Sequence, residues 1–223
     1  MRWARFVIAC ILTAASAAFV AVRFGDWRLQ QLESTVVKLE KEKADLRDFA
    51  ARLSASRRVG QVNVIEQKLD AGSRILTRLR WQEIGAGGVL DDPREIDAIG
   101  RQVYFEAFVL KFEPSLVGTG DKERGESLAL FRRIFGDNQT PSSATEFERA
   151  ARPRTSTQPA QSNDDALWLR FWEFTENPQL AATFGVRVAQ IEAPAIAVSQ
   201  GDVLEVTLDA AGGLNIRKIR PGP

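Results

Sequence analysis

The spacing of hydrophobic residues changes twice along the chain. An uncharged run covers residues 6–22, and in residues 26–58 apolar side chains then recur every three or four positions. After Gly60, apolar and polar residues alternate with a period of two over several short segments. A period of three to four residues is typical of a helix, and a period of two is typical of a β-strand. The pattern therefore predicts a long N-terminal helix followed by a β-rich domain, residues 60–223.

The first run is predicted to be a transmembrane signal-anchor. Residues 6–22 come close to the roughly 20 apolar residues that span a bilayer as a helix. Because Arg2 and Arg5 precede the run, the positive-inside rule predicts a cytoplasmic tail, residues 1–5, with the bulk of the chain outside, in the periplasm or at the cell exterior. The alternative is a signal peptide cleaved in the small residues 15–17, which would leave a secreted protein.

Residues 26–58 carry the heptad pattern of a coiled-coil stalk. Leucine fills four successive d positions, and neither glycine nor proline interrupts the segment. The predicted interface consists of Leu29, Val36, Lys43 and Ala50 at position a and Leu32, Leu39, Leu46 and Leu53 at position d. In a parallel pair each g residue meets the e residue five positions later on the other helix, so Arg28 meets Glu33 and Glu42 meets Arg47. We expect a parallel homodimer; a helix docked on its own β-domain or a zipper with another protein are the alternatives.

Six segments of the third region alternate as strands do. They are residues 75–84, 103–112, 128–135, 186–191, 203–208 and 214–219. Both faces of the segment 103–112 are apolar, which predicts a central strand. Short strands separated by glycine-containing turns predict an antiparallel β-sandwich or small barrel. The Pro-, Ser- and Thr-rich residues 140–163 are expected to form a mobile loop.

One packed helix is predicted within this domain, residues 164–176. Trp168, Phe171 and Trp172 recur at the spacing i, i+3, i+4 and therefore share one face. A face of this kind usually covers a sheet, so we expect the three rings in the core. The alternative is an exposed platform that binds a sugar or a protein partner.

Composition excludes several kinds of chemistry. The chain has no histidine, a single cysteine (Cys10) and a net charge of +1. A Ser-His-Asp or Cys-His catalytic arrangement, an internal disulfide and a multi-cysteine metal site are therefore excluded, and nothing favours nucleic acid as a partner. Acidic residues gather in residues 91–97 and 121–126, but arginine and lysine lie among them and the spacing is not that of a calcium loop. We interpret both stretches as solvated loops and expect no cofactor or metal.

Arg132 and Arg133 are adjacent basic residues and form a candidate anion site. Two adjacent guanidinium groups can bind a carboxylate, a phosphate or an acidic glycan. Neighbouring residues of a regular strand point to opposite faces of the sheet, however. The sequence therefore predicts that these two arginines do not share a site.

The order of parts indicates a function. A short inner tail, one membrane span, a leucine-zipper stalk and an outer domain resemble the layout of the bitopic envelope scaffolds of bacteria, and no family is assigned on this layout. We expect a non-catalytic scaffold or partner-binding protein of the cell envelope whose partner is an envelope protein or a glycan. The alternatives are a membrane-tethered, carboxylate-dependent hydrolase and a secreted carbohydrate-binding module.

Overall fold

The computed structural model describes residues 2–84, 90–144, 146–147 and 167–222, and it describes only the backbone of residues 2–26 and 29. The chain divides into two compact units, Met1–Asp48 and Phe49–Pro223. The second unit contains all of the β-structure and is called the β-domain below.

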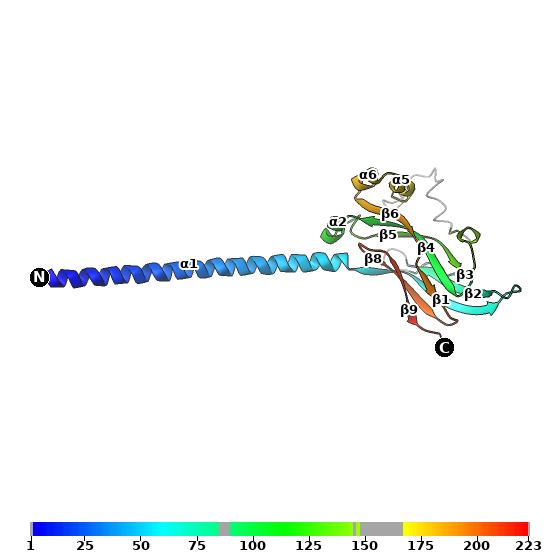
Figure 1. Ribbon diagram of the computed structural model, residues 1–223, viewed down its shortest axis with the longest axis horizontal. Coiled ribbons are helices and arrows are strands. Elements are labelled where there is room, and N and C mark those ends of the chain that lie inside the picture. The colour runs from blue at the N-terminus through cyan, green and yellow to red at the C-terminus, as the bar shows by residue number, and fades with distance from the viewer. Residues whose placement is uncertain (1, 85–89, 145, 148–166, 223) are drawn as a thin grey trace. The chain divides into compact units, whose positions relative to one another are not determined.

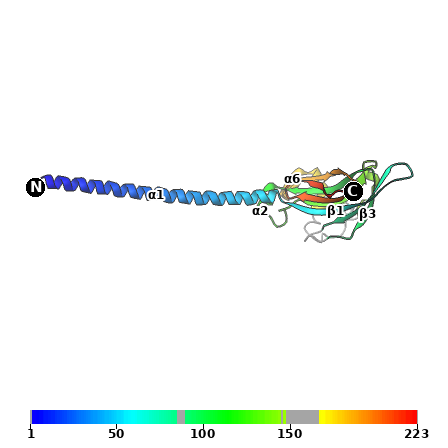
Figure 2. The same ribbon diagram turned by 90° about the horizontal axis from the view of Figure 1, so that it is seen from below.

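One helix, α1 (Arg2–Leu53), runs without a break along the N-terminal part of the chain (Figures 1 and 2). This stretch contains no proline, so no backbone N–H is missing from its hydrogen-bond ladder. The predicted stalk of residues 26–58 is too long, because the helix ends at Leu53 and a strand begins at Ser56. The helix ends before residue 55 because the following residues pair with the sheet. The N–H of Ala210 donates to the carbonyl of Ala55, and Ser56 pairs with Asp209.

The predicted anchor, residues 6–22, belongs to the part of α1 whose side chains lie outside the described residues. Among the residues whose side chains are described, no helix has the length and apolar character of a membrane span.

The β-domain contains two antiparallel sheets (Figure 1). Its strands are β1 (Ser56–Leu69), β2 (Ile75–Glu83), β3 (Arg94–Ile99), β4 (Gln102–Phe112), β5 (Leu128–Gly136), β6 (Val186–Glu192), β7 (Ala195–Ala197), β8 (Val203–Asp209) and β9 (Leu214–Arg220). One sheet has the strand order β3-β2-β1-β8-β9 and the other β5-β4-β6, with β7 also pairing with β4. The expectation of a mainly β, antiparallel fold is confirmed, and the arrangement is that of a β-sandwich.

All six strands predicted from the alternation are present, and the prediction that 103–112 is a central strand is confirmed by the place of β4 between its neighbours. Strands β1, β3 and β7 were not expected. The interpretation of residues 91–97 as a loop is wrong from Arg94 onward, because β3 begins there. Its charged residues are paired across the sheet: Asp97 lies 2.8 Å from Arg78 of β2, while Ala98 is buried beneath.

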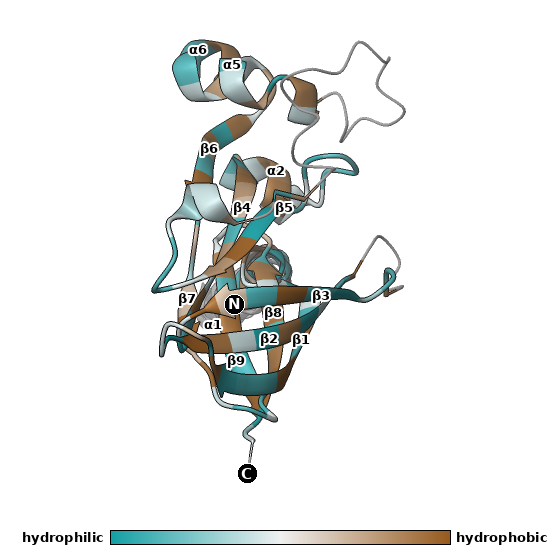
Figure 3. Ribbon diagram, turned by 90° about the vertical axis from the view of Figure 1, so that its right-hand side faces the viewer, coloured by the Kyte–Doolittle hydropathy of each residue, from teal (hydrophilic) through white to brown (hydrophobic). Residues whose placement is uncertain are grey.

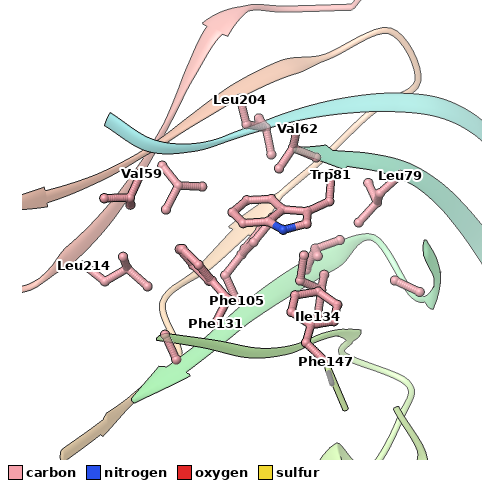
Figure 4. Packing of buried hydrophobic residues seen from close by; sticks show 14 of the residues in the cluster. Val59, Val62, Leu79, Trp81, Phe105, Phe131, Ile134, Phe147, Leu204 and Leu214 are labelled. Atoms are coloured by element: carbon pink, nitrogen blue, oxygen red, sulfur yellow. The ribbon is translucent and has the colours of Figure 1, made fainter. Parts of the chain in front are cut away.

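Apolar side chains between the two sheets form the first core. Trp81 of β2 lies at its centre, with its ring centroid 4.6 Å from that of Phe131 and 6.0 Å from that of Phe105 (Figure 4). The indole lies directly over Gly60 of β1, where a Cβ atom would overlap the ring. A glycine is therefore required at this position for Trp81 to reach the centre of the sandwich.

Strand β4 is covered on its other face by helices, which makes a third layer. Phe108, Leu110 and Phe112 of β4 pack there against residues of α5 (Phe171–Glu176) and α6 (Pro178–Thr183) and form the second core. Figure 3 shows α5 and α6 side by side over β6. Pro178 begins α6, and the side chain of Asn177 caps it by accepting a hydrogen bond from the N–H of Leu180.

The predicted helix of residues 164–176 differs from the structure. Residues 164–166 lie outside the described part, residues 167–169 are helical, and a turn at Arg170 separates them from α5. The N–H of Arg170 bonds to the carbonyl of Leu167, a tighter turn than an α-helix makes. The guanidinium of Arg170 lies 4.3 Å from the ring centroid of Phe184, so this turn is fixed by a cation–π contact.

The predicted mobile loop, residues 140–163, also needs correction where it is described. A short helix, η2 (Pro141–Ser143), lies at its start, and the side chain of Phe147 is buried in the first core. Residues 145 and 148–163 lie outside the described part.

Replacing Leu79 with alanine is expected to lower the free energy of unfolding by about 2–5 kcal/mol, because its side chain is fully buried in the first core. Leu69→Ala is the matched control, since this leucine lies on the adjacent strand β1 and is 68% exposed. Leu69→Ala should change the free energy of unfolding by no more than about 0.5 kcal/mol. Urea unfolding of the full-length chain, followed by tryptophan fluorescence, measures both, and equal losses would contradict the assigned core.

Candidate functional site

The predicted coiled-coil positions of α1 are largely exposed in the single chain. The exposed fractions are 62% for Leu32, 51% for Val36, 57% for Leu39 and 68% for Leu46, and Lys43 and Ala50 are exposed as well. The side chain of Leu29 lies outside the described residues. We call the row Leu32, Val36, Leu39, Lys43 and Leu46 the seam.

The last predicted interface residue, Leu53, differs from the others. It belongs to the β-domain unit and is partly buried against the second core. The neighbouring residues are fixed there too: Arg52 Nη1 donates to the carbonyl of Gly118 at 3.0 Å, and the Phe49 ring fills the space that a Cβ atom on Gly118 would take. Leu53 therefore contacts its own chain, and the seam is defined without it.

The aromatic helix face lies against the second core. Phe171 is completely buried, Trp168 is 6% exposed and Trp172 is partly buried. The ring centroid of Phe108, on β4, lies 4.7 Å from that of Phe171 and 5.4 Å from that of Trp172. Because these rings contact the sheet, they do not provide the exposed platform that was the alternative.

Arg132 and Arg133 contact the same carboxylates, so the prediction that they cannot share a site is wrong. Strand β5 has a β-bulge at this point: Glu106 of β4 pairs with Arg133, whereas the next residue of β4, Ala107, pairs with Phe131. Arg132 is the extra residue, and a bulge changes the direction of its side chain. The bulge also explains why Phe131 and Ile134, three positions apart, both lie in the first core.

These arginines form a bulge cluster with Glu106 and Glu146. Glu106 Oε1 accepts a hydrogen bond from Arg132 Nη1 at 3.0 Å and lies 3.2 Å from Arg133 Nε. Glu146 Oε1 accepts from Arg132 Nε at 2.6 Å and lies 3.6 Å from Arg133 Nη2. The guanidinium of Arg132 also lies over the Phe108 ring, 5.4 Å from its centroid. Two carboxylates thus neutralise two guanidinium groups at the surface of the four-stranded sheet.

Three further carboxylates are ion-paired elsewhere in the β-domain: Glu205 and Asp202 are buried, and Glu192 is partly buried. Burial acts to raise the pKa of Glu205, but hydrogen bonds from Arg217 (2.7 Å) and Arg58 outweigh it and lower that pKa below its usual value. Burial also acts to raise the pKa of Asp202, and Lys218 (2.8 Å) with two backbone N–H groups lowers it. For Glu192, the N–H of Leu214 and the ammonium of Lys111 likewise overcome burial, and its pKa is lowered.

The pKa shifts of the described carboxyl groups all have the same direction. A general acid that works near neutral pH needs a raised carboxyl pKa. The described carboxyl groups with a shifted pKa are Asp70, Asp97, Asp121, Glu192, Asp202 and Glu205, and all six shifts are downward. Within the described ranges, no group of three or more acidic or cysteine side chains is placed to hold a metal ion.

In comparisons with protein-family models, curated proteins and solved structures, none matches this chain.

The ion pairs of Glu205 predict acid sensitivity of the β-domain. Because its folded pKa is lowered, Glu205 contributes stability above its unfolded pKa of about 4.3, and that contribution is lost as the pH falls through the folded value. We expect Glu205→Gln to unfold at a lower temperature than the wild type at pH 7, with a smaller further loss between pH 5 and pH 3. Thermal melts over this range measure both effects. Glu176→Gln, at an exposed position, is the control, and its melting temperature should change with pH as that of the wild type does. If the melting temperature of Glu205→Gln fell with pH as steeply as that of the wild type, Glu205 would not be the source of the acid sensitivity.

Proposed function

We propose that this chain is a single-pass membrane protein of the cell envelope that forms a parallel homodimer through α1 and presents its β-domain outside the cytoplasm. Its role is non-catalytic: it acts as a scaffold or binds a partner. The observation that carries the proposal is the seam, in which three leucines and a valine are left exposed to water by a single chain.

The composition of the seam supports a second copy of the chain as its partner. Leu32, Leu39 and Leu46 are seven residues apart, the repeat that keeps one face of a helix against another in a left-handed coiled coil. Burying a leucine is worth about 1.5–3 kcal/mol, so leaving three of them exposed is unfavourable. Lys43 weakens the seam, but in a two-stranded coil its ammonium can still reach water.

Charges beside the seam favour the parallel orientation. In a parallel pair, Arg28 of one helix faces Glu33 of the other, and Glu42 faces Arg47. No like-charged pair arises at these positions. Each exposed pair contributes only tenths of a kcal/mol, so the charges select orientation and register more than they hold the dimer together.

The anchor supports association of so short a seam. From Leu32 to Leu46 the helix rises about 21 Å, and a coiled coil of this length is marginal in water. Two chains held in the same membrane by residues 6–22 would meet at a high effective concentration, which strengthens a weak contact without any new interaction.

Self-association is expected to depend on the seam leucines. The double variant Leu39→Ala, Leu46→Ala removes the large apolar side chains from two d layers and should weaken dimerisation by several kcal/mol. Val37→Ala is the matched control, because Val37 is 65% exposed but lies outside positions a and d. Sedimentation equilibrium of the full-length chain in detergent is expected to show a monomer for the double variant and a dimer for the control. Equal masses for the double variant and the wild type would rule out the seam as the interface.

The anchor is tested by the mass of the mature protein. An uncleaved signal-anchor predicts that the protein extracted from cell membranes keeps residues 1–22, because the anchor holds it there. Intact mass spectrometry of the membrane and soluble fractions measures this. A mature form that starts near residue 18 and is found in the soluble fraction would show a cleaved signal peptide and a secreted module instead.

A further inference from the structure

The bulge cluster has the chemistry of a carboxylate-binding site that is occupied by the chain itself. Of its two carboxylates, Glu106 belongs to the central strand β4 and its side chain is only 9% exposed. Glu146 comes from outside the sheet, and its side chain is 36% exposed. Glu106 is therefore a fixed part of the site, whereas Glu146 takes the position of a ligand.

The cationic part of the site remains in place without Glu146. The side chain of Arg133 is 8% exposed, and its Nη1 donates to the carbonyl of Pro141. Arg132 is held by Glu106 and by the Phe108 ring. Among the described residues, Arg133 Nε is buried without a well-aligned hydrogen bond, although it lies 3.2 Å from Glu106 Oε1. Without Glu146, two preoriented guanidinium groups would face a single carboxylate and carry one excess positive charge.

The position of the site, beside an edge strand, indicates that its ligand is a polypeptide. Strand β5 is an edge strand of the four-stranded sheet. The residue after Glu146 bonds to that edge, since the N–H of Phe147 donates to the carbonyl of Arg132 at 2.7 Å. The carboxylate thus comes from a residue whose neighbour makes a backbone hydrogen bond to the edge strand, the type of contact through which a peptide is recognised at a sheet edge.

We propose that Arg132 and Arg133 form a docking site for an acidic segment of a partner protein, whose carboxylate takes the place of the Glu146 carboxylate on the two guanidinium groups. Two guanidinium forks match a carboxylate by hydrogen bonds as well as by charge, which gives the site its preference. In the free chain Glu146 competes with the partner, because it is present at high effective concentration. This inference states which class of partner the proposed scaffold binds. Its biological meaning rests on the proposed function, but the binding site itself does not.

The test measures binding of a labelled peptide to the full-length chain. The probe is a fluorescein-labelled synthetic peptide with the sequence of residues 142–149, and fluorescence anisotropy reports its binding. Removing the internal competitor with Glu146→Ala should tighten binding by about tenfold or more. Adding Arg132→Gln to that variant, or replacing the peptide's glutamate at the position of Glu146 with glutamine, should abolish the gain. Glu176→Ala, an exposed glutamate of α5, is the control and should bind as weakly as the wild type.

Two results would overturn the proposal: equal binding of the glutamate and glutamine peptides to Glu146→Ala, or tighter binding of an oligosaccharide of glucuronic acid than of the peptide. Thermal melts verify that each variant is folded, and Glu146→Gln replaces Glu146→Ala if the latter unfolds. The double variant Leu39→Ala, Leu46→Ala should bind the peptide as the wild type does. A failure of the dimer model is thereby separated from a failure of the docking site.

Discussion

The need to bury apolar side chains determines how this chain is built. Strand β4 is apolar on both faces, so one face lies against the five-stranded sheet in the first core and the other against α5 and α6 in the second. The β-domain therefore has three layers: the five-stranded sheet, the four-stranded sheet that contains β4, and the helices α5 and α6. The seam of α1 is subject to the same requirement, but within a single chain its leucines remain exposed. The scaffold model therefore rests on the principle that also explains the fold.

Alternation along the sequence was sufficient to predict the strands with a regular apolar face. It failed where a strand begins irregularly or carries charge. Strand β1 was missed because residues before Gly60 continued the helical pattern, and a register shift between Arg58 and Gly60 interrupts the alternation there. Strand β3 was taken for an acidic loop because Glu95 and Asp97 face outward and pair with arginines of β2. Only the pairing with β2, the preceding strand, shows that these charges belong to a sheet.

The bulge cluster was beyond the reach of sequence for a related reason. The regular alternation of a strand separates Arg132 from Arg133, and a single extra residue in the pairing of β5 with β4 brings them together. Glu146 reaches them from a segment predicted to be a loop. The heptad positions of α1 were easier to read from the sequence, because a heptad is a local pattern. The C-terminal end of the heptad pattern was predicted incorrectly, because Leu53 packs against the second core of the folded β-domain.

Disulfide crosslinking between two copies in native membranes tests the central claim most directly. Cys10 is the single cysteine of the chain, so Cys10→Ala with Leu39→Cys places one thiol in the middle of the seam. In a parallel, in-register dimer the two thiols face each other across a d layer, and mild oxidation should give a covalent dimer on a non-reducing gel. Cys10→Ala with Val37→Cys, which places the thiol away from the seam, should remain monomeric. Equal crosslinking at both positions, or none at position 39, would contradict the account.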